Sequence, residues 1–177
     1  MISLSPTIKG LITAILMITA SVLIFNGQGS FENNLQYITY GLYIGGIVWT
    51  LVSYSHKEVL KTFKTYFTEG FKCFIVITFL MVIFTVGFLK TNPGMREEMA
   101  QNYRTELIKK GDKTPAEIDS MVIQAKEYYV TMVASMTIFG YLLIGAATTI
   151  IFSLILLLRN KKSSFEQMSS FKSDQQL

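Results

Sequence analysis

Long uncharged, mostly apolar stretches alternate with short polar segments along this chain. The apolar stretches run from Gly10 to Phe25, Leu35 to Tyr54, Cys73 to Leu89 and Val130 to Leu158. A helix needs about 20 predominantly apolar residues to cross the hydrocarbon of a bilayer. The pattern therefore predicts membrane helices at about 7–25, 35–54, 71–89 and 130–158.

The first apolar stretch follows a lysine, as the apolar part of a cleaved signal peptide does. The residues after it, "LIFNGQGS", are bulky where a cleavage site needs small ones. We therefore expect a retained membrane helix. Its length is sufficient if Lys9 joins the helix and extends its side chain to the lipid headgroups.

The segment between the third and fourth stretches predicts a helical hairpin over residues 92–128. Asn92 and Pro93 suit the cap and first position of a helix, and Gly111 suits its left-handed stop. Thr114 and Glu117 then form a capping-box pattern around a second proline. Apolar residues at helical spacing line both arms: Met95, Met99, Tyr103, Leu107, Ile118, Met121, Val122, Ala125, Tyr129 and Met132.

The second arm of this hairpin enters the fourth apolar stretch without a helix breaker. That continuity explains why the run ending at Leu158 is longer than a bilayer requires. Basic and acidic residues are equally frequent between Lys90 and Thr131. The balance argues against electrostatic capture of an anionic substrate. It favours amphipathic helices that pack on each other or lie at the membrane interface.

Lysine and arginine counts predict the orientation. They are absent from residues 26–34 but frequent in 55–72 and after Leu158. Because positive residues accumulate on the cytoplasmic side, both termini are predicted to be cytoplasmic and the hairpin external. Residues 55–72 also suit a short amphipathic helix against anionic lipid. We expect a single transmembrane domain over 1–162 and a disordered polar cytoplasmic tail over 163–177.

Small residues mark candidate helix contacts inside the membrane. Gly41 and Gly45 form a GxxxG pattern with Gly46 beside it, and Gly145 offers a similar small face in the fourth stretch. Small residues let helices approach closely. These glycines are expected to pack within one bundle or, alternatively, to form the seam of a homo-oligomer.

Composition excludes several functions. The net charge is +4, but the basic residues flank apolar stretches and form no nucleic-acid-binding stripe. The apolar stretches contain no Asp, Glu, Lys, Arg or His, which disfavours a proton path within one chain. A single cysteine and a single histidine offer no metal set. We expect no catalytic residue, no cofactor, no metal site and no enzyme activity.

The order of several short motifs resembles the uncharacterised bacterial membrane family known as domain of unknown function 4199. These motifs are "TIKGLI", "YGLYIGGI", "YFTEGFK", "NPG" and the hairpin with "TPAEI". The resemblance covers the chain to about Lys162. It implies a four-helix integral membrane protein of the bacterial inner membrane and carries no established activity.

The sequence thus predicts an all-α bundle of four transmembrane helices with an extramembrane amphipathic hairpin between the third and fourth. The expected function is that of a non-enzymatic accessory or interaction subunit. Its hairpin would contact an unknown membrane or periplasmic protein. The alternative is a small oligomeric transporter or channel.

Overall fold

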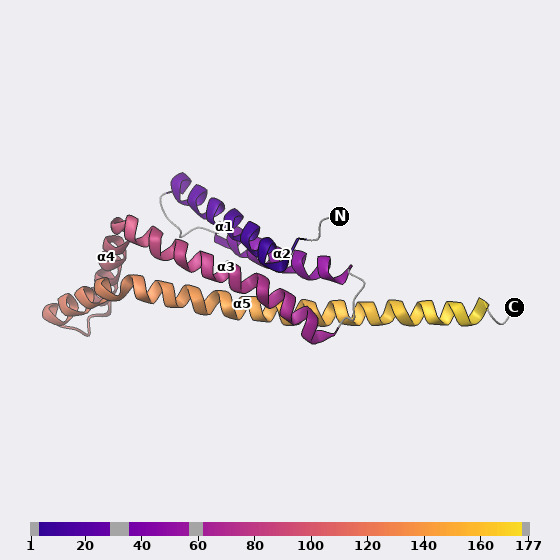
Figure 1. Cartoon of the computed structure of the whole chain (residues 1–177). Coiled ribbons are helices and arrows are strands. Elements are labelled where there is room, and N and C mark those ends of the chain that lie inside the picture. Colours follow the sequence, from indigo (N-terminus) through magenta and orange to yellow (C-terminus); the bar gives the residue numbers. More distant parts are fainter. Residues whose placement is uncertain (1–3, 29–35, 57–61, 175–177) are drawn as a thin grey trace. The chain divides into compact units, whose positions relative to one another are not determined.

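The computed structural model describes residues 4–28, 36–56 and 62–174, with side chains at 4–26, 37–56 and 62–160. Within these ranges the chain forms helices and no strand, so the predicted all-α class is confirmed (Figure 1). The helices are α1 (Pro6–Gln28), α2 (Gln36–Ser55), α3 (Phe63–Thr91), α4 (Pro93–Lys110) and α5 (Pro115–Asp174).

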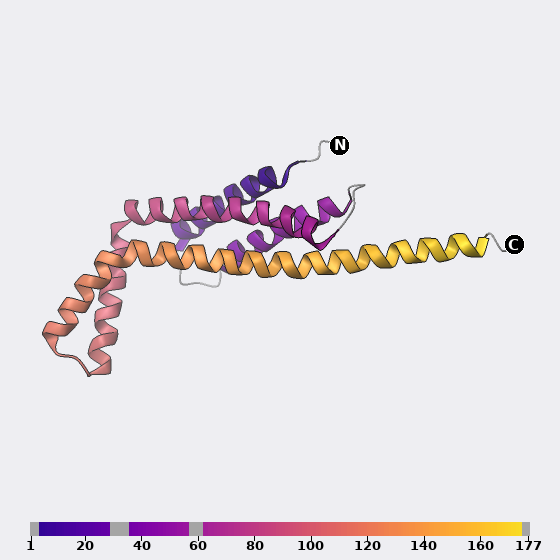
Figure 2. The same ribbon diagram turned by 60° about the horizontal axis from the view of Figure 1, so that its bottom comes forward.

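The chain divides into two compact units. Unit 1 comprises 1–78 and 141–177, and unit 2 comprises 79–140. Unit 1 contains α1, α2, the first part of α3 and the second part of α5. Unit 2 contains the end of α3, all of α4 and the beginning of α5, and it holds the predicted hairpin (Figure 2).

Three of the described helices are long and apolar enough to cross a membrane. Their candidate spans are Pro6–Asn26, Phe63–Thr91 and Pro115–Asn160. The second helix of the predicted bundle, α2, is not among them. Its aliphatic residues are interspersed with tyrosine, threonine and glycine.

Two helices extend further than the apolar stretches predicted. The third begins at Phe63 rather than near 71, because Thr62 and Thr65 exchange backbone-to-hydroxyl hydrogen bonds at its start. Lys57 and Lys61 of the expected amphipathic segment lie outside the described residues. The last helix continues to Asp174 through the tail predicted to be disordered. Residues 159–174 contain neither proline nor glycine, so an existing helix propagates through them at low cost.

Glycines allow close helix contacts inside unit 1. A Cβ at Gly46 of α2 would clash with Thr13 of α1, and one at Gly145 of α5 would clash with Tyr43 and Phe74. A Cβ at Gly10 would lie 2.7 Å from the Cys73 carbonyl oxygen. These positions require glycine because neighbouring atoms occupy the space of a side chain.

Gly41 and Gly45 behave differently from Gly46. A Cβ at either position would meet nothing within 4 Å. Both line a groove between α1 and α2 together with Leu16, Ile38 and Trp49. Among the described residues, the close contact of α2 is therefore made at Gly46 and not at Gly41 or Gly45. Periodicity alone could not separate them, since it does not say which face of α2 meets α1.

Hydrogen bonds satisfy much of the buried polar surface of unit 1. The Tyr43 hydroxyl donates to the Tyr141 carbonyl oxygen at 2.7 Å, and the Thr50 hydroxyl donates to Cys73 Sγ at 3.2 Å. Asn160 Nδ2 donates to the Tyr66 hydroxyl at 2.6 Å. Cys73 is buried in unit 1 and accepts this hydrogen bond from Thr50.

Lys9 departs from its predicted placement. Its side chain is only 6% exposed rather than extended to solvent, and its ammonium lies 5.2 Å from the centre of the Trp49 ring. A cation over an indole face is stabilised by the ring quadrupole, more strongly when water is excluded.

The two neighbouring glycines of α2 give a matched test of this packing. Gly46→Leu should destabilise the fold by about 1–3 kcal/mol because the added side chain overlaps Thr13. The midpoint of thermal unfolding in detergent should fall by several degrees, while Gly45→Leu should leave it nearly unchanged. Equal effects of the two substitutions would contradict this assignment.

Candidate functional site

The hairpin begins at Asn92, whose role differs from the prediction. The residue precedes Pro93 at the start of α4, but its side chain makes no cap hydrogen bond to that helix. Its Nδ2 instead donates to the Phe88 carbonyl oxygen at 2.9 Å, which satisfies an acceptor at the end of α3. The same oxygen also accepts the Asn92 N–H at 3.1 Å and the Thr91 hydroxyl at 3.0 Å, so several donors converge on the last turn of α3.

The turn of the hairpin has the geometry that its sequence predicted. Gly111 is left-handed, with φ 67°, and its N–H donates to the Leu107 carbonyl oxygen at 3.4 Å. The Thr114 N–H donates to the Glu117 carboxylate at 2.7 Å, and the Glu117 N–H donates to the Thr114 hydroxyl at 3.4 Å. These reciprocal bonds form a capping box at the start of α5.

A small apolar core holds the two arms of the hairpin together. Ala100 and Leu107 of α4 pack with Ile118 and Val122 of α5, and Tyr103 and Met121 cover them. Figure 2 shows the arms side by side and antiparallel. Most of these residues belong to the predicted stripes. Ala100 was missed because it lies beside, rather than on, the four-residue repeat of α4.

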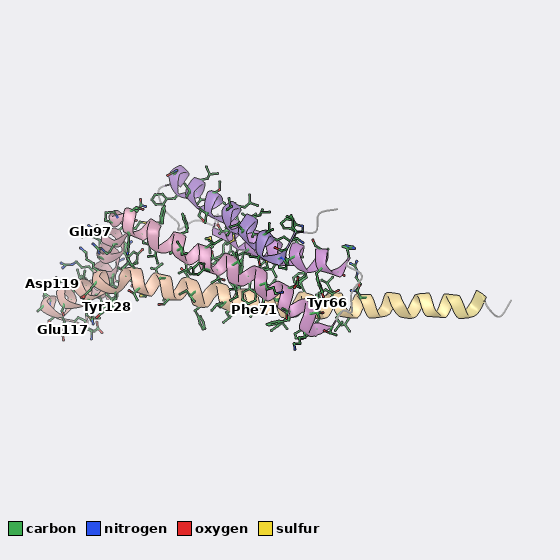
Figure 3. The ribbon with its side chains drawn as sticks, viewed as in Figure 1. Tyr66, Phe71, Glu97, Glu117, Asp119 and Tyr128 are labelled. Atoms are coloured by element: carbon green, nitrogen blue, oxygen red, sulfur yellow. The ribbon has the colours of Figure 1, made fainter. Side chains whose placement is uncertain are left out.

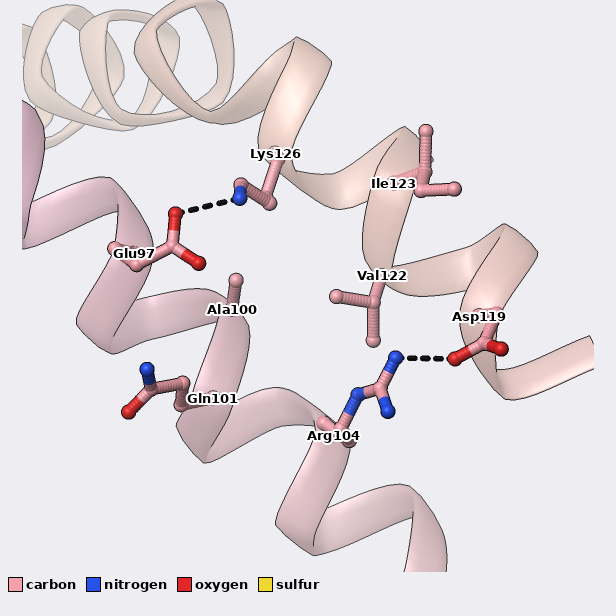
Figure 4. Close-up of a pocket in the computed structure, with 8 residues that line it drawn as sticks. All are labelled: Glu97, Ala100, Gln101, Arg104, Asp119, Val122, Ile123 and Lys126. Carbon is pink, nitrogen blue, oxygen red and sulfur yellow. Dashed lines mark hydrogen bonds and ion pairs between the residues drawn. The ribbon is translucent and has the colours of Figure 1, made fainter. Parts of the chain in front are cut away.

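One face of the hairpin carries a groove of about 430 Å³. We call it the hairpin groove; it is lined by Glu97, Ala100, Gln101, Arg104, Asp119, Val122, Ile123 and Lys126. Ala100 and Val122 lie between two ion pairs that join α4 to α5 (Figure 4). Ile123 is 66% exposed at the rim. The groove therefore combines a small apolar floor with charged ends.

The ion pairs connect residues far apart in the sequence. The Lys126 ammonium lies 2.5 Å from a Glu97 carboxylate oxygen, and Arg104 pairs with Asp119. The hydrogen bond and positive charge of Lys126 lower the pKa of Glu97. Glu97 and Asp119 project from the two arms of the hairpin (Figure 3). Sequence spacing could not have found either pair, because both cross the turn.

The pKa of Glu97 does not match that of a general acid or base. A general acid or base needs a carboxyl whose pKa is raised toward neutral pH by burial or by like charge. Glu97 is shifted in the opposite direction and its side chain is exposed.

Comparison with known proteins identifies the family of the chain. A family model described as "Protein of unknown function (DUF4199)" matches residues 7–157. The chain belongs to this family. The match includes α1 to α4 and the apolar part of α5, and it confirms the resemblance found in the sequence motifs. No curated protein and no solved structure matches the chain.

The Glu97–Lys126 pair can be tested by titration. Because Lys126 lowers the pKa of Glu97, the pair contributes stability above the carboxyl's unfolded pKa and loses it as pH falls through the folded pKa. In Lys126→Gln the Glu97 pKa should rise to the ordinary glutamate range. Carboxyl carbon chemical shifts would measure it, with Lys113→Gln as the control. An unchanged Glu97 pKa in Lys126→Gln would contradict the pairing.

Proposed function

We propose that this chain is a multi-pass membrane protein in which α2 crosses the membrane in addition to the three candidate spans of α1, α3 and α5. The supporting observation is its packing against α1, where Thr13 occupies the space that a side chain at Gly46 would need. Residues 37–54 of α2 carry no charged side chain. A helix of this length can cross the hydrocarbon when a neighbouring helix covers its polar face.

Within this arrangement we propose a non-enzymatic accessory or interaction subunit with the hairpin as its contact surface. The observation that carries the proposal is the hairpin groove, where Ile123 is exposed at the rim beside two ion pairs. A protein in contact with the groove would remove this apolar side chain from water. The proposal involves no cofactor and no nucleic acid, and its natural surroundings are the lipid bilayer.

A second candidate function is a small oligomeric transporter or channel. It is favoured by Thr149 and Ser153 of α5, which are fully buried in unit 1 and whose hydroxyls have no hydrogen-bond partner among the described residues. Buried hydroxyls are usually satisfied by protein or water. Unpaired hydroxyls one turn apart on a helix would suit a hydrated path in an assembled oligomer.

For the location we propose the inner membrane of a bacterium, with both termini in the cytoplasm. The lysines of residues 55–72 and the basic residues after Leu158 support this orientation. The hairpin would then face the periplasm, where a membrane or periplasmic partner could reach it.

Reporter fusions test the orientation. A reporter active only outside the cytoplasm should be active when fused after residue 105, and inactive after residues 60 and 165. A cytoplasmic reporter at the same three positions provides the control, because its pattern should be reversed. Cytoplasmic placement of residue 105 would overturn the proposed orientation.

Photo-cross-linking tests the contact function. A photoreactive phenylalanine analogue at Ile123 should yield a defined adduct in membranes, because the groove would be covered there. The analogue at Glu106, on the α4 face turned away from the groove, is the matched control. Absence of an Ile123 adduct, together with solute flux into liposomes that contain only the purified chain, would favour the transporter instead.

A further inference from the structure

The charges around the hairpin groove alternate in sign. Glu97 and Arg104 lie on α4, and Lys126 and Asp119 lie on the facing part of α5 (Figure 4). Each acid is paired with a base across the groove. On each helix, the two charged residues that line the groove have opposite signs. The four side chains therefore form a rectangle with like charges on its diagonals.

Such a rectangle is complementary to itself. If a second copy is turned over about an axis along the groove, α4 faces α5 of that copy, and Glu97 meets the second copy's Lys126. If the axis runs across the groove, α4 faces α4, and Glu97 meets the second copy's Arg104. Both are twofold operations, the symmetry of most protein dimers. Either operation places every acid opposite a base.

The existing ion pairs do not prevent this second set of contacts. A carboxylate accepts several hydrogen bonds, an ammonium donates three and a guanidinium donates five. All four side chains are at least one-third exposed, so their remaining donor and acceptor positions face outward. Each could retain its partner within the chain while it binds a second one, which would produce a charge network.

The apolar residues of the groove supply the rest of the contact. Ile123 is 66% exposed, and Ile108, one turn beyond Arg104 on α4, is 60% exposed. Ala100 is buried and small, so it leaves a recess in the floor between the ion pairs. In a twofold contact, Ile123 of each copy would cover the floor of the other and leave water.

We propose that the hairpin groove binds the same groove of a second copy of this chain. This inference rests on the proposed contact function of the hairpin and specifies its occupant. Confinement of both copies to one membrane raises their effective concentration and so favours association through a surface of modest size. The interface is isologous and combines the four alternating charges with an apolar centre.

Cysteine cross-linking of the full-length chain in membranes tests the proposal. Gln101→Cys places a thiol in the groove, and Glu106→Cys places one on the opposite face of α4. A bis-maleimide with a spacer of about 10 Å, roughly one helix diameter, should link Gln101→Cys into a dimer and leave Glu106→Cys monomeric. The chain without an added cysteine should not be cross-linked, because its single cysteine, Cys73, is buried. No dimer at position 101, or equal dimer at both positions, would overturn the proposal.

Two charge variants in the Gln101→Cys background test the complementarity itself. One makes the rim basic, with Glu97→Lys and Asp119→Lys, and the other makes it acidic, with Arg104→Glu and Lys126→Glu. Each alone should lose the cross-linked dimer, and co-expression with different tags should restore a mixed dimer. Restoration would also show that both variants fold. Dimers of either variant alone at the unmodified level, or no mixed dimer, would contradict the charge pattern.

The photo-cross-linking and cysteine cross-linking results together distinguish this inference from the proposed function. A photo-adduct of Ile123 with a different protein, without a cysteine dimer, would overturn the second-copy assignment while the hairpin remains a contact surface. Absence of both products would overturn the two proposals together.

Discussion

Hydrocarbon offers no hydrogen-bond partner to a peptide group, and this constraint limits where a helix that crosses a membrane can end. A helix that crosses a membrane must continue until its free N–H and C=O groups reach polar surroundings. All three prolines of the chain stand at the first residue of a helix: Pro6 at α1, Pro93 at α4 and Pro115 at α5. At that position the missing N–H removes no bond within the helix.

Side-chain hydroxyl groups also form hydrogen bonds between helices. Where Tyr43 reaches the backbone of α5, its hydroxyl binds a carbonyl oxygen that already belongs to a helix. Asn160 joins the hydroxyls of Ser55 and Tyr66 near the polar end of unit 1. With few charges available inside an apolar bundle, such neutral hydrogen bonds give the helix contacts their specificity.

Local patterns could be predicted from the sequence, and contacts between distant segments could not. The left-handed Gly111 and the Thr114–Glu117 capping box depend only on residues close in the sequence, so a short segment is enough to predict them. The ion pair between Glu97 and Lys126 depends on how α4 and α5 align across a turn. The glycines of α2 show the same limit, because their pattern indicates a small face but not which neighbour meets it.

The exposed turn at residues 111–114 has a consequence for how this hairpin can vary. The bond that ends α4 runs from Gly111 back to Leu107, and those that start α5 run between Thr114 and Glu117. Each cap is complete on its own side, so extra residues inserted after Gly111 would break neither. Lengthening a loop costs little entropy once its ends are fixed. An epitope tag or a small fluorescent domain placed there would therefore leave both helices intact, which makes this turn the natural position for following the protein in a living membrane.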